Sequence, residues 1–155
     1  MFDVLMFLFE HYMDGAASLK TDNPTITVEL ERAGFSRSEI DRALDWLDGL
    51  IYFRNAVEAT STLVSHAIRH YLPEESEQLG VAGQGFLLCL EQLGILDPVT
   101  REIVIDRLMV LDNREVDLGR IKWVVLMVLF SQPEKKAALN LLQDMILQDT
   151  SGALH

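Results

Sequence analysis

The sequence has little cysteine, few basic residues and no long apolar run, and each shortage excludes a class of protein. One Cys among 155 residues can form neither a disulfide framework nor a Cys-based zinc site. The longest stretch without a charged residue is Gln78–Leu90, 13 residues, whereas a membrane-spanning helix needs roughly 18–20 apolar ones. Met1–Glu10 has no basic region and contains Asp3, so we predict no signal peptide. We therefore expect a cytoplasmic protein that does not span a membrane.

The shortage of basic residues bears on nucleic acid. There are 13 Lys and Arg against 24 Asp and Glu, a formal net charge of −11. Because non-specific nucleic-acid binding depends on the neutralisation of phosphates, this balance disfavours it. The 49% of hydrophobic residues is ample for the core of a folded domain of this length. Composition thus indicates an acidic folded protein and names no activity.

The apolar residues recur at the 3–4 spacing of helices along most of the chain, so we predict an all-α fold. Pro24 and Pro98 each follow a capping residue, and Asp117 is a further cap. Ser36 and Glu39 have the spacing of a capping box, with Phe35 and Ile40 at the positions of a hydrophobic staple. The predicted helices cover about 2–13, 24–33, 36–51, 74–79, 85–93, 98–111, 118–130 and 134–147, and a short strand remains the alternative for 25–28.

Residues 52–72 lack helical periodicity. We expect a surface loop at 55–65 and one short strand or wing near 66–72. The prediction is a helix–turn–helix-like amino-terminal unit, residues 1–72, packed on a carboxy-terminal helical bundle, residues 73–155. One compact domain is the alternative organisation.

Motifs that would carry catalysis or bind a metal are weak. Cys89 lies between leucines, which predicts a small buried residue rather than a nucleophile. His66 and His70 are four residues apart but have no third histidine nearby, so surface histidines are the better interpretation. Trp46 and Trp123 lie on apolar stripes and are assigned to the core. We predict no catalytic, cofactor-binding or metal-binding residue, no cofactor, and no enzymatic activity.

Two surfaces are candidates for a protein partner. The first helix has more apolar residues than one face requires, so Phe2, Leu5 and Phe7 are candidates for a partner surface or a homodimer seam. The third helix has acidic residues opposite its apolar stripe, namely Asp41, Asp45 and Asp48. The alternative function is a winged-helix nucleic-acid binder, whose contacts would be Arg32, Arg37, Arg42, Arg54 and Arg69.

Several blocks of the sequence are similar to those of the bacterial Smg family. They are the first ten residues, 33–35 with 43–47, 85–92, 101–107, 122–130 and the final Gly-Ala-Leu-His. The sequence departs from the family pattern at Cys89, His70 and Gly119-Arg120. The resemblance covers nearly the whole chain but implies no catalytic motif. It implies a role near DNA uptake, DNA processing or translation, because the family takes its name together with a DNA-processing protein encoded beside it in many bacteria.

Overall fold

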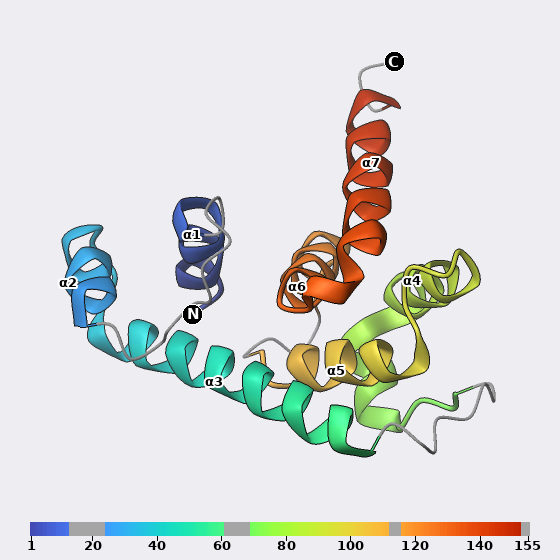
Figure 1. Cartoon of the computed structure of the whole chain (residues 1–155), viewed down its shortest axis with the longest axis horizontal. Helices are drawn as coiled ribbons and strands as arrows, with labels where there is room; N and C mark the ends of the chain where they lie inside the picture. The colour runs from blue at the N-terminus through green and yellow to red at the C-terminus, as the bar shows by residue number, and fades with distance from the viewer. Residues whose placement is uncertain (13–23, 61–68, 112–115, 153–155) are drawn as a thin grey trace. The chain divides into compact units, whose positions relative to one another are not determined.

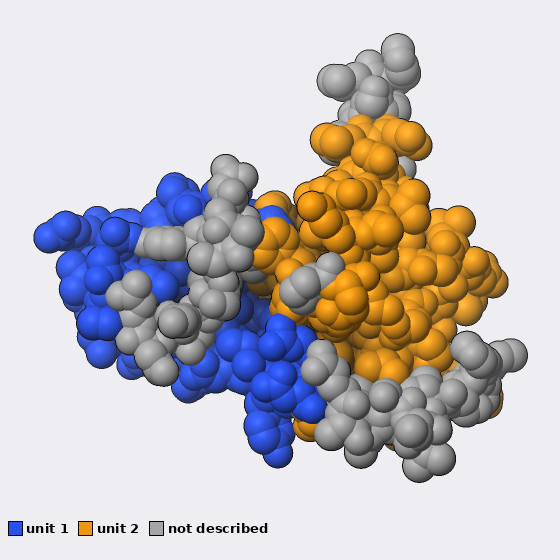
Figure 2. Space-filling model, viewed as in Figure 1, with its two compact units in different colours: residues 1–55 blue, residues 56–155 orange. Residues whose placement is uncertain are grey.

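The computed structural model describes residues 1–12, 24–60, 69–111 and 116–152 (Figure 1). Every regular element in these ranges is a helix, which confirms the all-α prediction. The chain forms two compact units, Met1–Asn55 and Ala56–His155 (Figure 2). No helix in the described ranges combines the length and the apolar character that crossing a bilayer requires. The predicted boundary at residue 72 separates parts that fold independently. Compactness alone does not test independent folding, so this boundary stays a prediction.

Unit 1 contains α1 (Phe2–Tyr12), α2 (Pro24–Arg32) and the first part of α3 (Arg37–Thr60). The helix α2 begins at Pro24 as predicted, and the segment that could have been a strand is helical. Gly34 has a φ of 98° after α2, a conformation that favours glycine. The core of this unit is formed by the apolar stripes of the helices, including Ile26, Leu30, Ile40, Ala43, Trp46, Leu47 and Leu50.

The capping box at the start of α3 forms as predicted. The backbone N–H of Ser36 donates to Glu39 Oε2 at 3.1 Å, and the backbone N–H of Glu39 donates to Ser36 Oγ at 3.3 Å. These bonds satisfy two amide groups that have no partner inside the helix. The hydrogen bonds from Ser36 also lower the pKa of Glu39 below its ordinary value. The start of α3 is therefore determined locally.

The end of α3 contradicts the sequence analysis. The helix continues to Thr60, so the loop predicted from residue 55 is wrong for residues 55–60. The segment from Tyr52 to Thr60 contains neither Gly nor Pro, and an established helix continues until a residue breaks it, even where its apolar stripe ends. Residues 69–72 are neither helix nor strand, so the predicted strand is wrong there. Residues 61–68 lie outside the described ranges, and the helix–turn–helix-like detail stays a prediction.

Unit 2 continues with α4 (Pro73–Gln92), α5 (Pro98–Met109), α6 (Leu118–Phe130), the 3₁₀ turn η3 (Pro133–Lys135) and α7 (Lys136–Gly152). The helix α6 packs against α4, α5 and α7, and all residues from Val124 to Leu129 are buried. The helix α6 therefore forms the centre of the core of this unit. The predicted caps also form, since Asp97 accepts from the Thr100 N–H at 2.7 Å and Asp117 from the Arg120 N–H at 2.8 Å.

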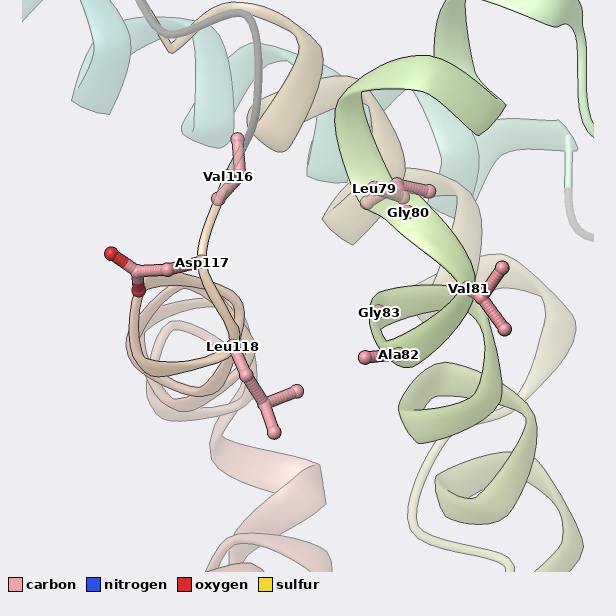
Figure 3. A pocket seen from close by; sticks show the side chains of 8 residues that line it. All are labelled: Leu79, Gly80, Val81, Ala82, Gly83, Val116, Asp117 and Leu118. Atoms are coloured by element: carbon pink, nitrogen blue, oxygen red, sulfur yellow. The ribbon is translucent and has the colours of Figure 1, made fainter.

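The helix α4 was predicted as two helices. It is a single element with a break at Gly80, where φ is 64° and ψ is 174°, and the ribbon changes direction there (Figure 3). A left-handed φ of this kind favours glycine. Beyond the break, α4 lies so close to α6 that a Cβ at Gly83 would stand 2.6 Å from Ile121 Cδ1. The two glycines have different roles: Gly80 permits the turn and Gly83 permits the close packing.

Two residues assigned to the core are not buried. Cys89 is exposed, because the buried side of α4 is formed by Gly83, Leu87 and Leu90. Trp123 is half-exposed, because the fully buried run of α6 begins one residue later. In both places the sequence is apolar over more than one helical face, so periodicity does not identify the inner face. Trp46 is 1% exposed, which confirms its assignment to the core.

Candidate functional site

The acidic candidates lie together on α3 in unit 1. Asp41, Asp45 and Asp48 are all exposed, and their spacing of four and three residues places them along one side of the helix. The opposite side is held in the core by residues that include Ile40, Ala43 and Trp46. The carboxylates therefore lie in one solvent-exposed row, with Asp41 at its start paired to Arg37.

Tyr52 extends this row and was missed by the sequence analysis. Its side chain is 75% exposed, and it follows Asp48 by four residues on the same helix. We call the four residues Asp41, Asp45, Asp48 and Tyr52 the acidic face of α3. The available signal was the continued 41, 45, 48, 52 spacing, and it was missed because α3 was expected to end near residue 51. The face of an exposed aromatic ring beside carboxylates can contact a cation or an apolar side chain.

The candidates on α1 are largely covered. Leu5 is 1% exposed, and Val4 and Leu8 on the same helix are also buried. Phe2 and Phe7 are half-buried. The Phe7 ring stacks on His11 with 4.0 Å between ring centroids and meets Phe35 edge-on at 5.6 Å. The α1 surface therefore leaves less apolar area for a partner than its sequence suggests.

Three of the five arginines proposed for nucleic acid have carboxylate or carbonyl partners within unit 1. Arg37 pairs with Glu31 at 3.0 Å and with Asp41 at 3.3 Å, and these partners raise its pKa. Arg42 Nε donates to the Ser38 carbonyl at 3.4 Å, and Arg54 Nη2 donates to Asn55 Oδ1 at 3.5 Å. Arg32 is exposed at the end of α2. A phosphate at Arg37 would have to compete with two carboxylates, which opposes docking.

The fifth arginine, Arg69, belongs to a half-buried ion network in unit 2. Its guanidinium donates twice to Glu75, at 2.6 and 2.8 Å, and once to Glu102 at 2.6 Å. The side chain of Arg69 is 17% exposed and that of Glu75 is 11% exposed. The hydrogen bonds from Arg69 lower the pKa of Glu75 despite the opposing effect of its burial, and the carboxylates raise the pKa of Arg69.

A second arginine extends the same network. Arg101 is 9% exposed and pairs with Glu102 at 3.0 Å and with Glu91 at 3.0 Å. Glu75 also accepts from the Leu72 N–H at 3.0 Å, which caps the start of α4. Two arginines and three glutamates thus join residues 69–72 to α4 and α5. Because bidentate, shielded pairs of this kind hold one geometry, the network organises this part of the unit and leaves Arg69 poorly placed to bind phosphate.

This network was not predicted from the sequence, because the partners of Arg69 are 6 and 33 residues away. No local pattern couples residues at the larger separation. Tyr71 lies beside the network, with the Arg69 guanidinium carbon 5.0 Å from the centroid of its ring, and burial raises the pKa of its hydroxyl.

A small cavity lies between the break in α4 and the start of α6 (Figure 3). Its volume is about 340 Å³, near the lower end of the range for small-molecule sites. Its lining is almost entirely apolar or glycine, namely Leu79, Gly80, Val81, Ala82, Gly83, Val116 and Leu118, with Asp117 as the one charged residue. Asp117 caps α6, and its carboxylate points away from α4 in Figure 3. The cavity therefore offers shape but few groups that would orient a polar ligand.

Metal ligands do not converge in the described ranges, where no group of three or more His, Cys, Asp or Glu side chains is placed to hold an ion. Of the paired histidines, His70 is exposed and His66 lies outside the described ranges.

Comparison with known proteins places the chain in a family. The model of the family "protein of unknown function (DUF494)" matches residues 1–155. A Smg homolog of Alkalilimnicola ehrlichii is 46% identical over 154 residues, which cover 99% of this chain and 97% of the relative. Smg homologs of Shewanella piezotolerans and Nitrosococcus oceani are 43% and 41% identical, over 100% and 99% of this chain and 99% and 96% of the relatives. No solved structure matches the chain. The extent of these similarities confirms the resemblance noted in the sequence, and the chain belongs to the DUF494 family of Smg homologs.

Proposed function

We propose that the protein is a non-enzymatic cytosolic interaction protein that binds a basic surface on another protein through the acidic face of α3. The observation that carries the proposal is the alignment of three exposed carboxylates and an exposed tyrosine on one side of a helix. The partner belongs to DNA processing or translation, the area that the resemblance to the Smg family implies.

The chemistry of the face supports a basic protein partner. Carboxylates in a row attract lysine and arginine and accelerate their encounter, while an exposed tyrosine supplies contact area at a small entropic cost. The net charge of −11 also attracts a basic partner at long range.

The runner-up is nucleic-acid binding through Arg32, Arg37, Arg42, Arg54 and Arg69. Against it, Arg37 is held by two carboxylates, Asp41 and Asp45 lie on the same helix as Arg37 and Arg42, and Arg69 is committed to Glu75 and Glu102. The acidic face of α3 would repel a phosphate backbone at the surface where a recognition helix must dock.

The test is affinity capture from a bacterial lysate, with and without nuclease, followed by mass spectrometry. The variant Asp41→Lys/Asp45→Lys/Asp48→Lys reverses the acidic face. The control Glu74→Lys/Glu134→Lys/Asp144→Lys changes the net charge equally at three other exposed acids. We expect a set of nuclease-resistant proteins that the wild type and the control retain and the α3 variant loses. Equal capture by the α3 variant would contradict the proposal.

The nucleic-acid alternative has its own test. Fluorescence anisotropy with labelled DNA and RNA at about 100–150 mM salt should show no binding at low-micromolar protein, since non-specific affinities are weak at this salt. Tighter, salt-sensitive binding that the Arg37→Ala/Arg42→Ala variant loses would favour the runner-up instead.

A further inference from the structure

The second half of α4 is apolar on both of its sides. Beyond the break at Gly80, the inward side consists of Gly83, Leu87 and Leu90. The outward side carries no charged residue, and we call it the outer face of α4: Val81, Ala82, Gly85, Leu88, Cys89, Gln92 and Leu93, all exposed. Their helical angles, at 100° per residue, fall within one arc of about 140°. A helix segment with apolar residues on two opposite sides is normally buried on both of them.

The exposure of this face is large for apolar side chains. Val81 is 90% exposed, Leu88 52% and Leu93 54%. These residues are contiguous on one helix, unlike the scattered apolar residues that every surface contains. A contiguous apolar patch of this kind usually marks an interaction site.

Gly85 gives a second and independent indication. It lies near the centre of the outer face, in a regular part of the helix, and a Cβ built on it would meet nothing within 4 Å. Glycine inside a helix is destabilising relative to alanine. At Gly83 the same cost has a local reason, because a Cβ there would stand 2.6 Å from Ile121 Cδ1. At Gly85 nothing within the described fold requires glycine, which fits close approach by another molecule.

We propose that the outer face of α4 is the contact between two copies of this chain, which cross antiparallel at Gly85. In this arrangement residue positions that sum to 170 face each other. Val81 then faces Cys89 of the partner subunit, and Leu88 faces Ala82 of the partner subunit. Each pair sets a larger side chain against a smaller one, so the surface is complementary to itself, as a two-fold contact requires. The proposal does not depend on the acidic face of α3.

The net charge of the chain favours a second copy as the partner at the outer face of α4. Two chains of net charge −11 repel each other wherever acidic surfaces meet. Five of the seven residues of the outer face lie within Gln78–Leu90, the longest uncharged stretch of the sequence. The remaining side of that stretch, including Leu79, Leu87 and Leu90, is buried. The outer face therefore lets two copies approach without setting carboxylates against carboxylates. A second copy of this acidic chain needs an uncharged contact surface more than a neutral or basic partner does.

The size of the face determines how tight the contact is. A standard interface uses about 20–30 residues on each side and buries about 800 Å² per partner, whereas the outer face offers seven residues. The dimer is accordingly weak and forms in the upper micromolar range. Sedimentation of the full chain must extend from low micromolar concentration to several hundred micromolar to detect it.

Cysteine cross-linking tests the geometry. The variant Val81→Cys places a second thiol opposite the partner subunit's Cys89, so mild oxidation should give a disulfide-linked dimer. In the wild type the two Cys89 side chains lie about 12 Å apart along the crossing, so oxidation should give almost none. Leu141→Cys, on α7 and 54% exposed, is the control for random collision. Equal linking in Val81→Cys and Leu141→Cys would overturn the proposal, as would efficient linking of the wild type, which indicates a parallel arrangement.

Substitution of Gly85 tests the contact in two directions. Gly85→Ala should raise the melting temperature of the dilute monomer, because it removes a helix-destabilising glycine, and weaken dimerisation several-fold. Gly85→Leu and Leu88→Glu should abolish the dimer while circular dichroism shows an intact fold, and Leu141→Glu should leave the dimer unchanged. A wild-type chain that sediments as a monomer at every concentration overturns the proposal, since the face would then be covered within the same chain or serve another partner.

Discussion

The two units differ in where they place their tryptophan and their ion-paired arginines. Unit 1 buries its tryptophan, Trp46, and leaves the Arg37 ion pairs in solvent, with Arg37 66% exposed. Unit 2 leaves Trp123 half-exposed and shields its arginines, with Arg69 17% and Arg101 9% exposed. The same residue types therefore contribute to stability in one unit and to the surface in the other, and burial decides which.

This comparison separates the surfaces that can change from those that cannot. Asp41, Asp45 and Asp48 of α3 can be replaced at little expense of stability, because all three are exposed to water. The ion network of unit 2 cannot, because removing one member leaves another charge shielded from water without its partner. Loss of binding in a variant of the acidic face of α3 can therefore be assigned to the surface, whereas loss of function in an Arg69 variant cannot.

The largest expected effect distinguishes the two tryptophans. Trp46→Ala should lower the free energy of unfolding by about 3–5 kcal/mol, because it removes a ring that is fully enclosed. Trp123→Ala should cost less than Trp46→Ala, because Trp123 is partly exposed whereas Trp46 is 1% exposed. Urea denaturation followed by circular dichroism measures both. A larger loss for Trp123→Ala would reverse the assignment of the two rings.

The next effect tests the ion network. Arg69→Met keeps the aliphatic stem but removes the guanidinium, so the shielded Glu75 carboxylate loses two hydrogen bonds. We expect a loss of about 2–4 kcal/mol, measured by urea denaturation at neutral pH. Arg69→Met/Glu75→Leu removes both charges and should recover part of the loss. If the double variant loses as much stability as Arg69→Met and Glu75→Leu lose separately, added together, Arg69 and Glu75 do not interact.

A smaller effect concerns the dependence of stability on pH. The pKa of Glu75 is lowered in the folded protein, so its contribution is present above its unfolded pKa of about 4.3 and is lost as the pH falls through the folded value. Glu75→Gln should cost about 1–2 kcal/mol at neutral pH, and the difference from wild type should shrink below about pH 4. Melting temperatures across the acid range provide the measurement. A constant difference down to the acid limit would show that ionised Glu75 contributes nothing.

Helix caps were predictable from the sequence, and contacts between residues far apart in the chain were not. The caps Asp97 and Asp117 and the box of Ser36 and Glu39 were predicted correctly, because each depends on residues three positions apart. The break at Gly80 was also visible, as a gap between two predicted helices. By contrast, the pairing of Arg69 with Glu102 joins residues 33 positions apart, and nothing in either neighbourhood indicates the other.

Exposure was harder to predict than secondary structure. The helices α4 and α6 are both apolar over long stretches, yet residues 124–129 of α6 are all buried while α4 exposes Val81, Leu88 and Cys89. Hydrophobicity indicates that such a segment seeks a partner, but not whether the partner lies within the chain. Of the candidate surfaces, the acids of α3 were predicted to be exposed and are, because their spacing opposes a clear apolar stripe. The surplus apolar residues of α1 had no such opposing pattern, and most of them are covered.

The smallest expected effect completes the comparison. Arg37→Met removes a side chain that pairs with Glu31 and Asp41, but all three are well exposed, at 66%, 45% and 57%. Water and salt already screen these charges, so the free energy of unfolding should hardly change, and what change there is should vanish at high salt. Arg69 also pairs with carboxylates, but the same substitution there is expected to have several times this effect on the free energy of unfolding. Urea denaturation at low and high salt decides the matter. A large, salt-independent loss at Arg37 would mean that its pairs are sheltered from water, and that Asp41 stabilises the fold rather than serving a partner surface.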